Sequence, residues 1–203
     1  MTSSKQTSFF EAITTLTELK KQKRMGWVKR GVKEAESVAD HSWRAGLMAY
    51  MLAPDGYDKE KMLKMGLIHD ATEIFGDDVT PVDGMSKAEK EKLERKAVEK
   101  FFALLPPPLR NEFHEIWEEF EEKKTKEAIF VKQVEVLEML FQALEYEKDQ
   151  NFEQDLTEWI VYEKNNRKTE WHPVLKPYFE EIEKRWPAES KKNYDHSKNK
   201  YYY

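Results

Sequence analysis

The sequence contains no cysteine, and this absence excludes several kinds of chemistry. Disulfides, thiolate metal ligands and cysteine nucleophiles are all excluded, and the absence agrees with a reducing compartment. Glycine (7) and proline (8) are few among the 203 residues, which disfavours a turn-rich all-β fold. Aromatic residues make up 13% of the chain, too many for a disordered protein.

The chain also lacks a basic excess and a long apolar run. Its 34 basic and 39 acidic residues give a net charge of −5, whereas a domain that binds a nucleic-acid polymer normally carries a basic excess. A small anionic ligand remains compatible, because a local pocket can differ from the net charge. No segment approaches the roughly 18–20 apolar residues that span a bilayer, and residues 1–6 precede no signal-peptide core. We therefore expect a cytoplasmic protein without nucleic-acid or membrane partners.

The apolar residues recur at helical spacing almost everywhere, with no alternating strand pattern and no internal repeat. The sequence thus predicts an all-α fold. Its length suits one domain, which we place at residues 1–187. Residues 188–203 are rich in Lys, Asn, Ser and Tyr without an apolar period, and they are predicted to form a flexible tail.

Polar residues mark where several helices should begin. Ser37, followed three positions later by Asp40, resembles a capping box for a helix that runs to about residue 52. Asp58 is expected to cap the next helix, and Ser86 with Glu89 forms a capping box for a later one. Apolar stripes predict further helices over about residues 9–19, 113–120, 125–146, 152–162 and 173–186.

Two of the five histidines lie beside an aspartate, as Asp40-His41 and His69-Asp70. Imidazole and carboxylate groups are good ligands for divalent Mn, Co, Fe or Zn, although each histidine could equally be a half-buried structural side chain. Glu73 follows His69 by four residues, so on one continuous helix it would project from the same face. This spacing strengthens the metal-site hypothesis.

An acidic stripe on the helix predicted over residues 125–146 has two interpretations. The residues that repeat at spacings of four and three are Val131, Glu135, Glu138, Gln142 and Glu145. Apolar residues on the other sides of the helix favour a solvated face. The alternative is that one carboxylate points into a metal cavity.

Trp27 lies in an unusual segment, residues 24–30, which also holds Gly26 and three cations. On the pattern alone, the favoured interpretation is a Trp that fills the core between helices. The alternative is an anion-binding loop in which Arg24 grips a phosphate and Trp27 stacks on a planar ring.

Together these segments resemble the HD-domain phosphohydrolases, and more narrowly their 5′-deoxynucleotidase branch. The resemblance covers roughly residues 10–185. The segments that carry it are residues 24–27 (RMGW), 36–41 (ESVADH), 69–73 (HDATE), 78–81 (DVTP) and 130–133 (FVKQ), with Glu138, Met139 and Gln142.

The resemblance implies an HD-domain helical bundle with one divalent metal ion (Mn, Co, Fe, Zn or Mg) between its central helices. It implies that the metal ligands are His41, His69, Asp70 and Glu135. At position 135 the family has Asp, so this chain departs from it by one methylene. A bound divalent metal lowers the pKa of water and polarises a phosphoryl oxygen.

The resemblance also assigns roles around the metal. Glu73 and Asp78 match catalytic carboxylates, one of which can protonate the leaving oxygen. It assigns Arg24 and Trp27 to substrate binding. We predict that Arg44 and Asp77 also contact the substrate, although the family usually has Gly in place of Asp77.

The predicted function is therefore a metal-dependent phosphatase that acts on (deoxy)nucleoside 5′-monophosphates, small-molecule substrates. Two alternatives remain: an HD phosphohydrolase for another small phosphate ester, and a non-catalytic nucleotide-binding protein with a degenerate metal site. The resemblance further implies a homodimer.

Overall fold

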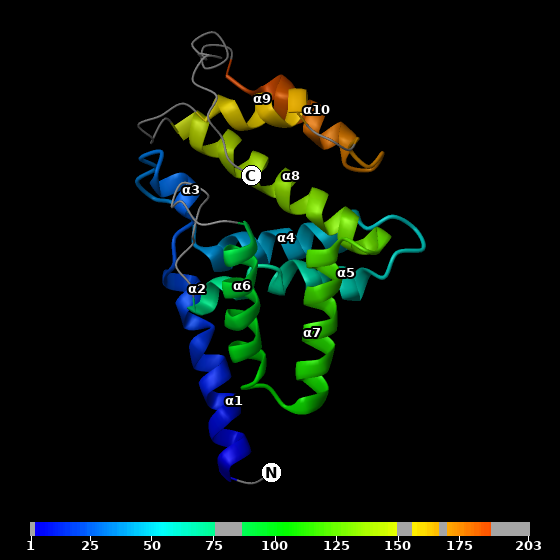
Figure 1. Cartoon of the computed structure of the whole chain (residues 1–203). Coiled ribbons are helices and arrows are strands. Elements are labelled where there is room, and N and C mark those ends of the chain that lie inside the picture. The colour runs from blue at the N-terminus through cyan, green and yellow to red at the C-terminus, as the bar shows by residue number, and fades with distance from the viewer. Residues whose placement is uncertain (1–2, 76–86, 150–155, 167–169, 188–203) are drawn as a thin grey trace.

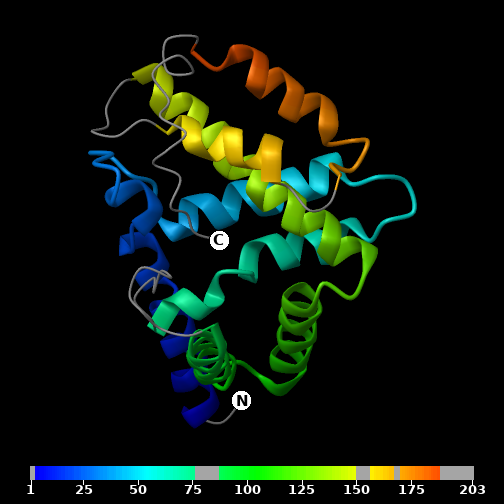
Figure 2. The same cartoon turned by 45° about the horizontal axis from the view of Figure 1, so that its top comes forward.

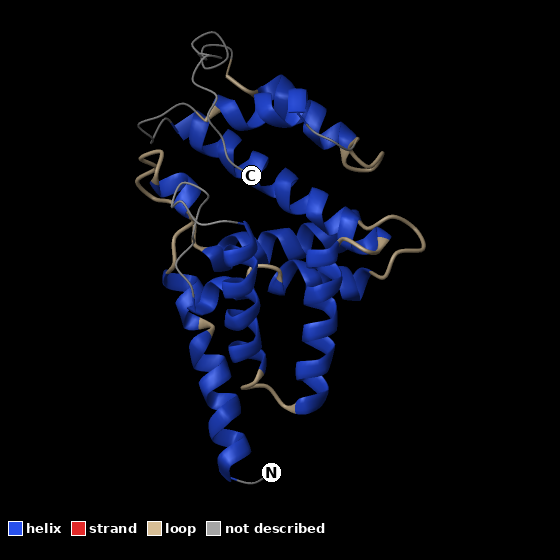
Figure 3. Ribbon diagram, viewed as in Figure 1, coloured by secondary structure: helices blue, strands red, loops and turns tan. Residues whose placement is uncertain are grey.

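The computed structural model of the protein describes residues 3–75, 87–149, 156–166 and 170–187. In these ranges the chain forms helices joined by loops, without a strand (Figure 3), and Lys23 and Ser37 make one isolated antiparallel bridge. The predicted all-α class is confirmed. None of the helices in the described ranges has the length and apolar character that crossing a bilayer requires.

The described ranges contain ten α-helices and one 3-10 helix. In order, the elements are α1 (Ser3–Thr15), α2 (Thr17–Lys21), α3 (Met25–Val28), α4 (Val38–Leu52), α5 (Lys59–Ile68), the 3-10 helix η1 (Ala71–Phe75), α6 (Lys87–Phe102), α7 (Pro107–Glu122), α8 (Lys126–Asp149), α9 (Thr157–Asn166) and α10 (Lys176–Arg185).

Helices α4 and α5 lie side by side in the middle of the molecule (Figures 1 and 2). Helix α8 packs across both of them and carries α9 and α10 on its far side. Helices α1, α6 and α7 lie on the opposite side of the central pair. Polar side chains of α4 and α5 that face α8 are therefore enclosed by protein.

The central pair crosses at two glycines. A Cβ atom on Gly66 of α5 would lie 2.5 Å from the Cα and 2.8 Å from the backbone nitrogen of Gly46 on α4. Real Cβ atoms do not approach other backbone atoms so closely, so this crossing requires glycine. The contact brings the first turns of α4 close to the end of α5.

Two of the predicted helix starts are confirmed by their caps. The Ser37 hydroxyl accepts a hydrogen bond from the Asp40 amide (3.1 Å), and the Asp40 carboxylate accepts one from the Ser37 amide (2.8 Å). This side-chain bonding with Ser37 lowers the pKa of Asp40. The Asp58 carboxylate accepts from the Lys61 amide (3.0 Å) at the start of α5.

The prediction that His69 and Glu73 share one continuous helical face is wrong. Helix α5 ends at Ile68, and Glu73 belongs to the separate 3-10 helix η1. The His69 ring nitrogen Nδ1 bonds the Gly66 carbonyl (2.8 Å), so a side chain competes for the backbone acceptors of the last turn. The amide of Glu73 then donates to the Asp70 carbonyl (3.0 Å), which starts the tighter turn.

Other boundaries differ from the sequence prediction in smaller ways. The predicted first helix is divided at Leu16 into α1 and α2, and residues 25–28 form the short helix α3. The last two predicted helices begin at Thr157 and Lys176. Ser86 and the predicted tail, residues 188–203, lie outside the described residues, and the domain boundary at residue 187 stays a prediction.

Candidate metal centre

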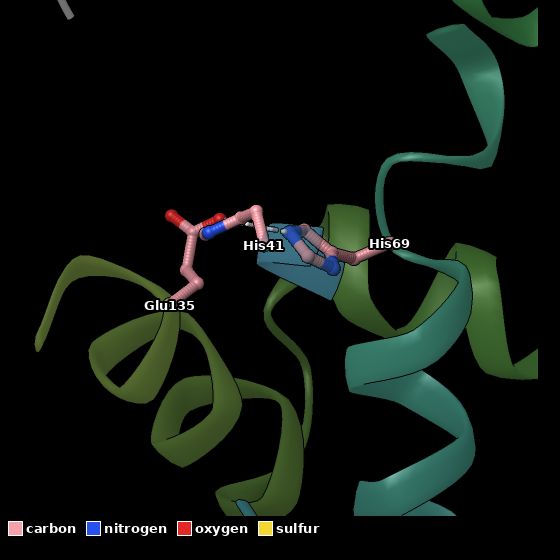
Figure 4. A group of neighbouring side chains, drawn as sticks. All are labelled: His41, His69 and Glu135. Atoms are coloured by element: carbon pink, nitrogen blue, oxygen red, sulfur yellow. Dashed lines mark hydrogen bonds and ion pairs between the residues drawn. The ribbon is translucent and has the colours of Figure 1, made fainter. Parts of the chain in front are cut away.

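Three predicted ligands from three different helical segments meet between the central helices. His41 lies in the first turn of α4, His69 directly follows α5, and Glu135 lies on α8. Figure 4 shows their side chains pointing toward one another. The two Nε2 atoms are 3.2 Å apart, His69 Nε2 lies 3.4 Å from Glu135 Oε2, and the three ligand atoms all lie within 4.8 Å of one another.

Asp70, the fourth predicted ligand, contributes a carboxylate to the same place. Its Oδ2 atom lies 3.3 Å from His69 Nε2 and 3.8 Å from His41 Nε2. The two imidazoles are almost fully enclosed, at 0% and 3% exposure for His41 and His69. The structure thus brings the whole predicted ligand set together.

The hydrogen bonds of the two histidines fit a cation at this place. His69 Nδ1 faces the Gly66 carbonyl, and His41 Nδ1 directly contacts the Glu138 carboxylate. The His69 contact requires a proton on Nδ1 because a carbonyl only accepts, and the His41 contact requires one while Glu138 is ionised. The Nε2 atoms are then the groups that the two rings turn toward each other. Two lone pairs at 3.2 Å repel unless a proton or a metal cation lies between them. Two imidazoles and two carboxylates suit divalent Mn, Fe, Co or Zn.

The pKa values of the two histidines move in opposite directions. Burial and the nearby Arg24 cation lower the pKa of His41 well below its ordinary value. Burial also acts to lower the pKa of His69, but the Asp70 and Glu135 charges outweigh it and raise this pKa to about 9. The pair therefore behaves as a site for one positive charge.

Cationic side chains hold the carboxylates of Asp70 and Glu135 in their charged form. Arg24 Nη1 donates to Asp70 Oδ2 (2.9 Å), and Lys132 forms an ion pair with Glu135 (2.8 Å). Burial acts to raise the pKa of Asp70, yet the charges of His69 and Arg24 keep it well below its ordinary value. The pKa of Glu135 is also lowered, because Lys132 and His69 outweigh its burial.

Arg24 lies at the edge of the ligand group, as the substrate-binding prediction requires. Burial acts to lower its pKa, but the charges of Asp70, Glu73 and Glu135 raise it further above its ordinary value. Arg24 is thus a permanent cation beside the centre. The same interactions place Glu73 of η1 in the electrostatic surroundings of the site, where it is half-buried.

The structure favours the core interpretation of Trp27. Its ring is 1% exposed, with ring centroids 4.0 Å from Trp159 and 5.2 Å from Tyr146. Its Nε1 donates to Glu36 Oε1 (2.9 Å). A base could stack on this ring only if the surrounding side chains moved, so its role in substrate binding stays a prediction.

Arg44 bonds to Glu138, not to the four predicted ligands, and lies near Glu36. Its Nε atom donates to Glu138 Oε1 (2.6 Å), and its Nη2 lies 4.0 Å from Glu36 Oε2. Its predicted contact with substrate stays a prediction. Asp77 and Asp78 lie outside the described residues.

The acidic stripe of α8 is not a single solvated face. Glu138 is 0% exposed and the Glu135 side chain 15%, so the solvated-face interpretation is wrong for both. It holds for Glu145, whose side chain is 56% exposed. Sequence reasoning assigned no role to Glu138 or to Glu36. The available signal was the place of Glu138 three residues after Glu135 in the same stripe.

Comparison with known proteins places the chain in a family. Residues 16–175 match the family model described as the HD domain. The chain belongs to the HD domain family. This membership confirms the family resemblance drawn from the sequence and the helical bundle that it implies.

Named relatives in the HD domain family cover most of the chain. The 5′-deoxynucleotidase HDDC2 of Mus musculus is 41% identical over 134 residues, 66% of this chain and 67% of its own. The 5′-deoxynucleotidase hdd1 of Schizosaccharomyces pombe is 32% identical over 186 residues, 90% of this chain and 92% of its own. A conserved hypothetical protein from Pyrococcus furiosus superposes with a TM-score of 0.71 at 31% identity, over 86% of this chain and 99% of that chain.

Proposed function

We propose that the protein is a metal-dependent phosphatase that hydrolyses (deoxy)nucleoside 5′-monophosphates to nucleoside and phosphate. The observation that carries the proposal is the convergence of two imidazoles and two carboxylates beside a permanent cation, Arg24. The relatives named 5′-deoxynucleotidase support the same reaction and favour the deoxy forms of the substrate.

In this proposal His41, His69, Asp70 and Glu135 hold one divalent ion. The ion supplies Lewis-acid polarisation of the phosphoryl group and lowers the pKa of water. Glu135 replaces the Asp of the family, and its 3.4 Å separation from His69 Nε2 supports a ligand role despite the longer side chain. Its charge matters more than its length for holding a dication.

Arg24 and a nearby carboxyl group complete the proposed chemistry. A guanidinium has five N–H groups, so the bond from Arg24 to Asp70 leaves further donors for phosphoryl oxygens. Glu73, or Asp78, donates the proton that the leaving 5′-oxygen needs. The half-buried position of Glu73 and its electrostatic interaction with Arg24 place its carboxyl group close to the centre.

Phosphate release from a substrate panel tests the proposal. The metal-free protein is loaded separately with Mn, Co, Fe, Zn or Mg and given the deoxy and ribose monophosphates of each base. We expect turnover of the deoxy forms, lost in His69→Ala and kept in His114→Ala, because His114 lies on α7 with its side chain 35% exposed. Turnover confined to other phosphate esters would refute the proposal in favour of an HD phosphohydrolase for such an ester. Nucleotide binding without turnover under every metal would refute it in favour of a non-catalytic nucleotide-binding protein.

We also propose that two copies of the chain associate through the outer face of α4. On α4, four exposed apolar residues recur at helical spacing on this face: Trp43, Leu47, Tyr50 and Met51. The side chain of Leu67 from α5 lies next to Gly46 of α4. The exposed fractions are 62% for Trp43, 38% for Leu47, 43% for Tyr50, 69% for Met51 and 42% for Leu67. Contiguous exposed apolar groups of this kind are typical of interfaces.

The molar mass from light scattering tests the association. We expect a dimeric parent and a monomeric Trp43→Glu variant, because a buried charge without a partner is costly at an interface. A monomeric parent, or a dimeric Trp43→Glu variant, would contradict this surface. The cytoplasmic location stays a prediction from the composition.

A further inference from the structure

Glu138 is the most completely enclosed carboxylate near the centre, and both of its oxygens are engaged. Its side chain is 0% exposed. Oε2 contacts His41 Nδ1 directly, and Oε1 accepts from Arg44 Nε at 2.6 Å. A buried carboxylate is costly unless its charge is balanced and its lone pairs are satisfied, and these contacts bring a cation to the group and engage both oxygens.

The contact with His41 fixes which nitrogen faces the site. An ionised carboxylate only accepts hydrogen bonds, so beside ionised Glu138 the His41 ring carries its proton on Nδ1. The lone pair of Nε2 is then directed at His69 and Asp70, where a metal would bind. Without an acceptor at Nδ1, the proton could move to Nε2, and that tautomer cannot bind a metal through Nε2.

Arg44 holds the carboxylate in place from the same helix that carries His41. Because Arg44 follows His41 by three residues, both side chains project from one face of α4 toward Glu138 on α8. Arg44 Nη2 also donates to the Glu138 backbone carbonyl (3.3 Å). The guanidinium therefore ties both the side chain and the backbone of Glu138 to α4.

Glu36, His41 and Glu138 have ligand atoms close enough to suggest a second metal site. Arg44 already places a cation among these groups, because it bonds Glu138 and lies 4.0 Å from Glu36 Oε2. Glu36 in turn accepts from Trp27 Nε1 (2.9 Å). The Arg44 guanidinium therefore supplies the positive charge that a second metal ion would bring. This arrangement favours a supporting role for Glu138 over a role as a metal ligand.

We infer that Glu138 is a positioning residue that holds His41 as the Nδ1–H tautomer with its Nε2 lone pair directed at the metal site, and that Arg44 keeps Glu138 in place. The inference rests on the proposed function because it takes His41 as a metal ligand. Hydrogen-bond partners of ligating histidines typically change metal affinity about 10–100-fold when they are replaced.

The first measurement is the tautomer of His41 in the metal-free protein, read from long-range nitrogen–proton NMR spectra of its ring. We expect the Nδ1–H form in the parent and in Glu145→Leu, a matched change on the exposed side of the same helix. Glu138→Leu should shift the ring toward the Nε2–H form. A parent ring in the Nε2–H form, or an unchanged ring in folded Glu138→Leu, would overturn the inference.

The second measurement is Zn²⁺ affinity by calorimetry. Glu138→Leu should bind about 100-fold more weakly than the parent, and Glu138→Gln about tenfold, because one amide oxygen cannot serve both His41 and Arg44. Glu145→Leu should match the parent. If Glu138→Leu does not fold, the Glu138→Gln variant decides the question. A Glu138→Gln protein with the parent Zn²⁺ affinity and the parent ring spectrum would then overturn the inference.

The two measurements separate this inference from the proposed function. A parent protein that binds no metal refutes the proposed metal centre, while the ring spectra of the metal-free protein still test the role of Glu138. The converse result is also distinguishable. If His41→Ala loses Zn²⁺ while both Glu138 variants keep the parent affinity and ring spectra, the metal centre is supported and only the positioning role is refuted.

Discussion

Replacing Gly66 by Ala tests whether the crossing of α4 and α5 builds the metal centre. The new Cβ atom would lie 2.5 Å from the Cα of Gly46, whereas carbon atoms pack best at about 3.5–4.0 Å. Both partners are backbone, so no side chain can rotate away. The two helices must therefore separate by about 1 Å at this point.

The cost can be worked out from opposing contributions. Overpacking costs about 1–3 kcal/mol, and the contact between two backbones places Gly66→Ala near the upper end. Alanine in a helix recovers about 1 kcal/mol relative to glycine. We expect a net loss of about 2 kcal/mol in the free energy of unfolding, which lowers Tm by about 4–8 °C in a chain of this size.

The same substitution should weaken metal binding. His69 follows Gly66 by three residues and bonds its carbonyl (2.8 Å), so a shift of this turn moves His69 relative to His41. Thermal unfolding followed by circular dichroism gives Tm, and calorimetric titration of the metal-free protein gives the affinity.

Gly56→Ala is the matched control for Gly66→Ala. Gly56 has a φ of +77° and no heavy atom within 4 Å of a new Cβ, so Ala there is strained without pushing any helix. We expect a loss of about 1–2 kcal/mol from the left-handed conformation and an unchanged metal affinity. Parent stability and parent affinity in Gly66→Ala would refute the proposed close crossing.

Three further substitutions test individual side chains. Glu135→Gln should lower metal affinity about tenfold or more in calorimetry, whereas Glu135→Asp should keep or improve it, because carboxylate charge holds the dication. Trp27→Ala should lower the free energy of unfolding by about 3–5 kcal/mol because the ring is buried, and a raised KM with parent Tm would instead favour base stacking. Arg24→Ala should raise KM for monophosphates through lost phosphate contacts, and an unchanged KM would exclude that role.

Helix starts were readable from the sequence because they depend on local hydrogen bonds. The Ser37–Asp40 box and the Asp58 cap involve residues three positions apart, and both are present as predicted. The end of α5 was not readable in the same way. It depends on the His69 ring bonding the Gly66 carbonyl, a competition between side chain and backbone that residue spacing does not reveal.

The family resemblance predicted the ligand set, whereas helical spacing alone gave an incorrect supporting argument for it. Glu73 was expected to reach the site from the helical face of His69, but it lies on the separate η1 turn. It still lies in the surroundings of Arg24, because the chain folds back after Asp70. The catalytic role of Glu73 stays a prediction.

The acidic stripe of α8 shows what periodicity cannot decide. A spacing of three and four residues says that Glu135, Glu138 and Glu145 share a face, but not what that face meets. Along α8 the exposure of this face changes from buried Glu138 to exposed Glu145, while α8 as a whole packs on both α4 and α5. Three carboxylates that look alike in the sequence therefore differ in their surroundings: one faces two histidines, one is bonded by Arg44, and one faces solvent. Only the partners brought by α4 and α5 distinguish a ligand from a positioning group, which is why exchanging Glu138 and Glu145 for Leu should have such different effects.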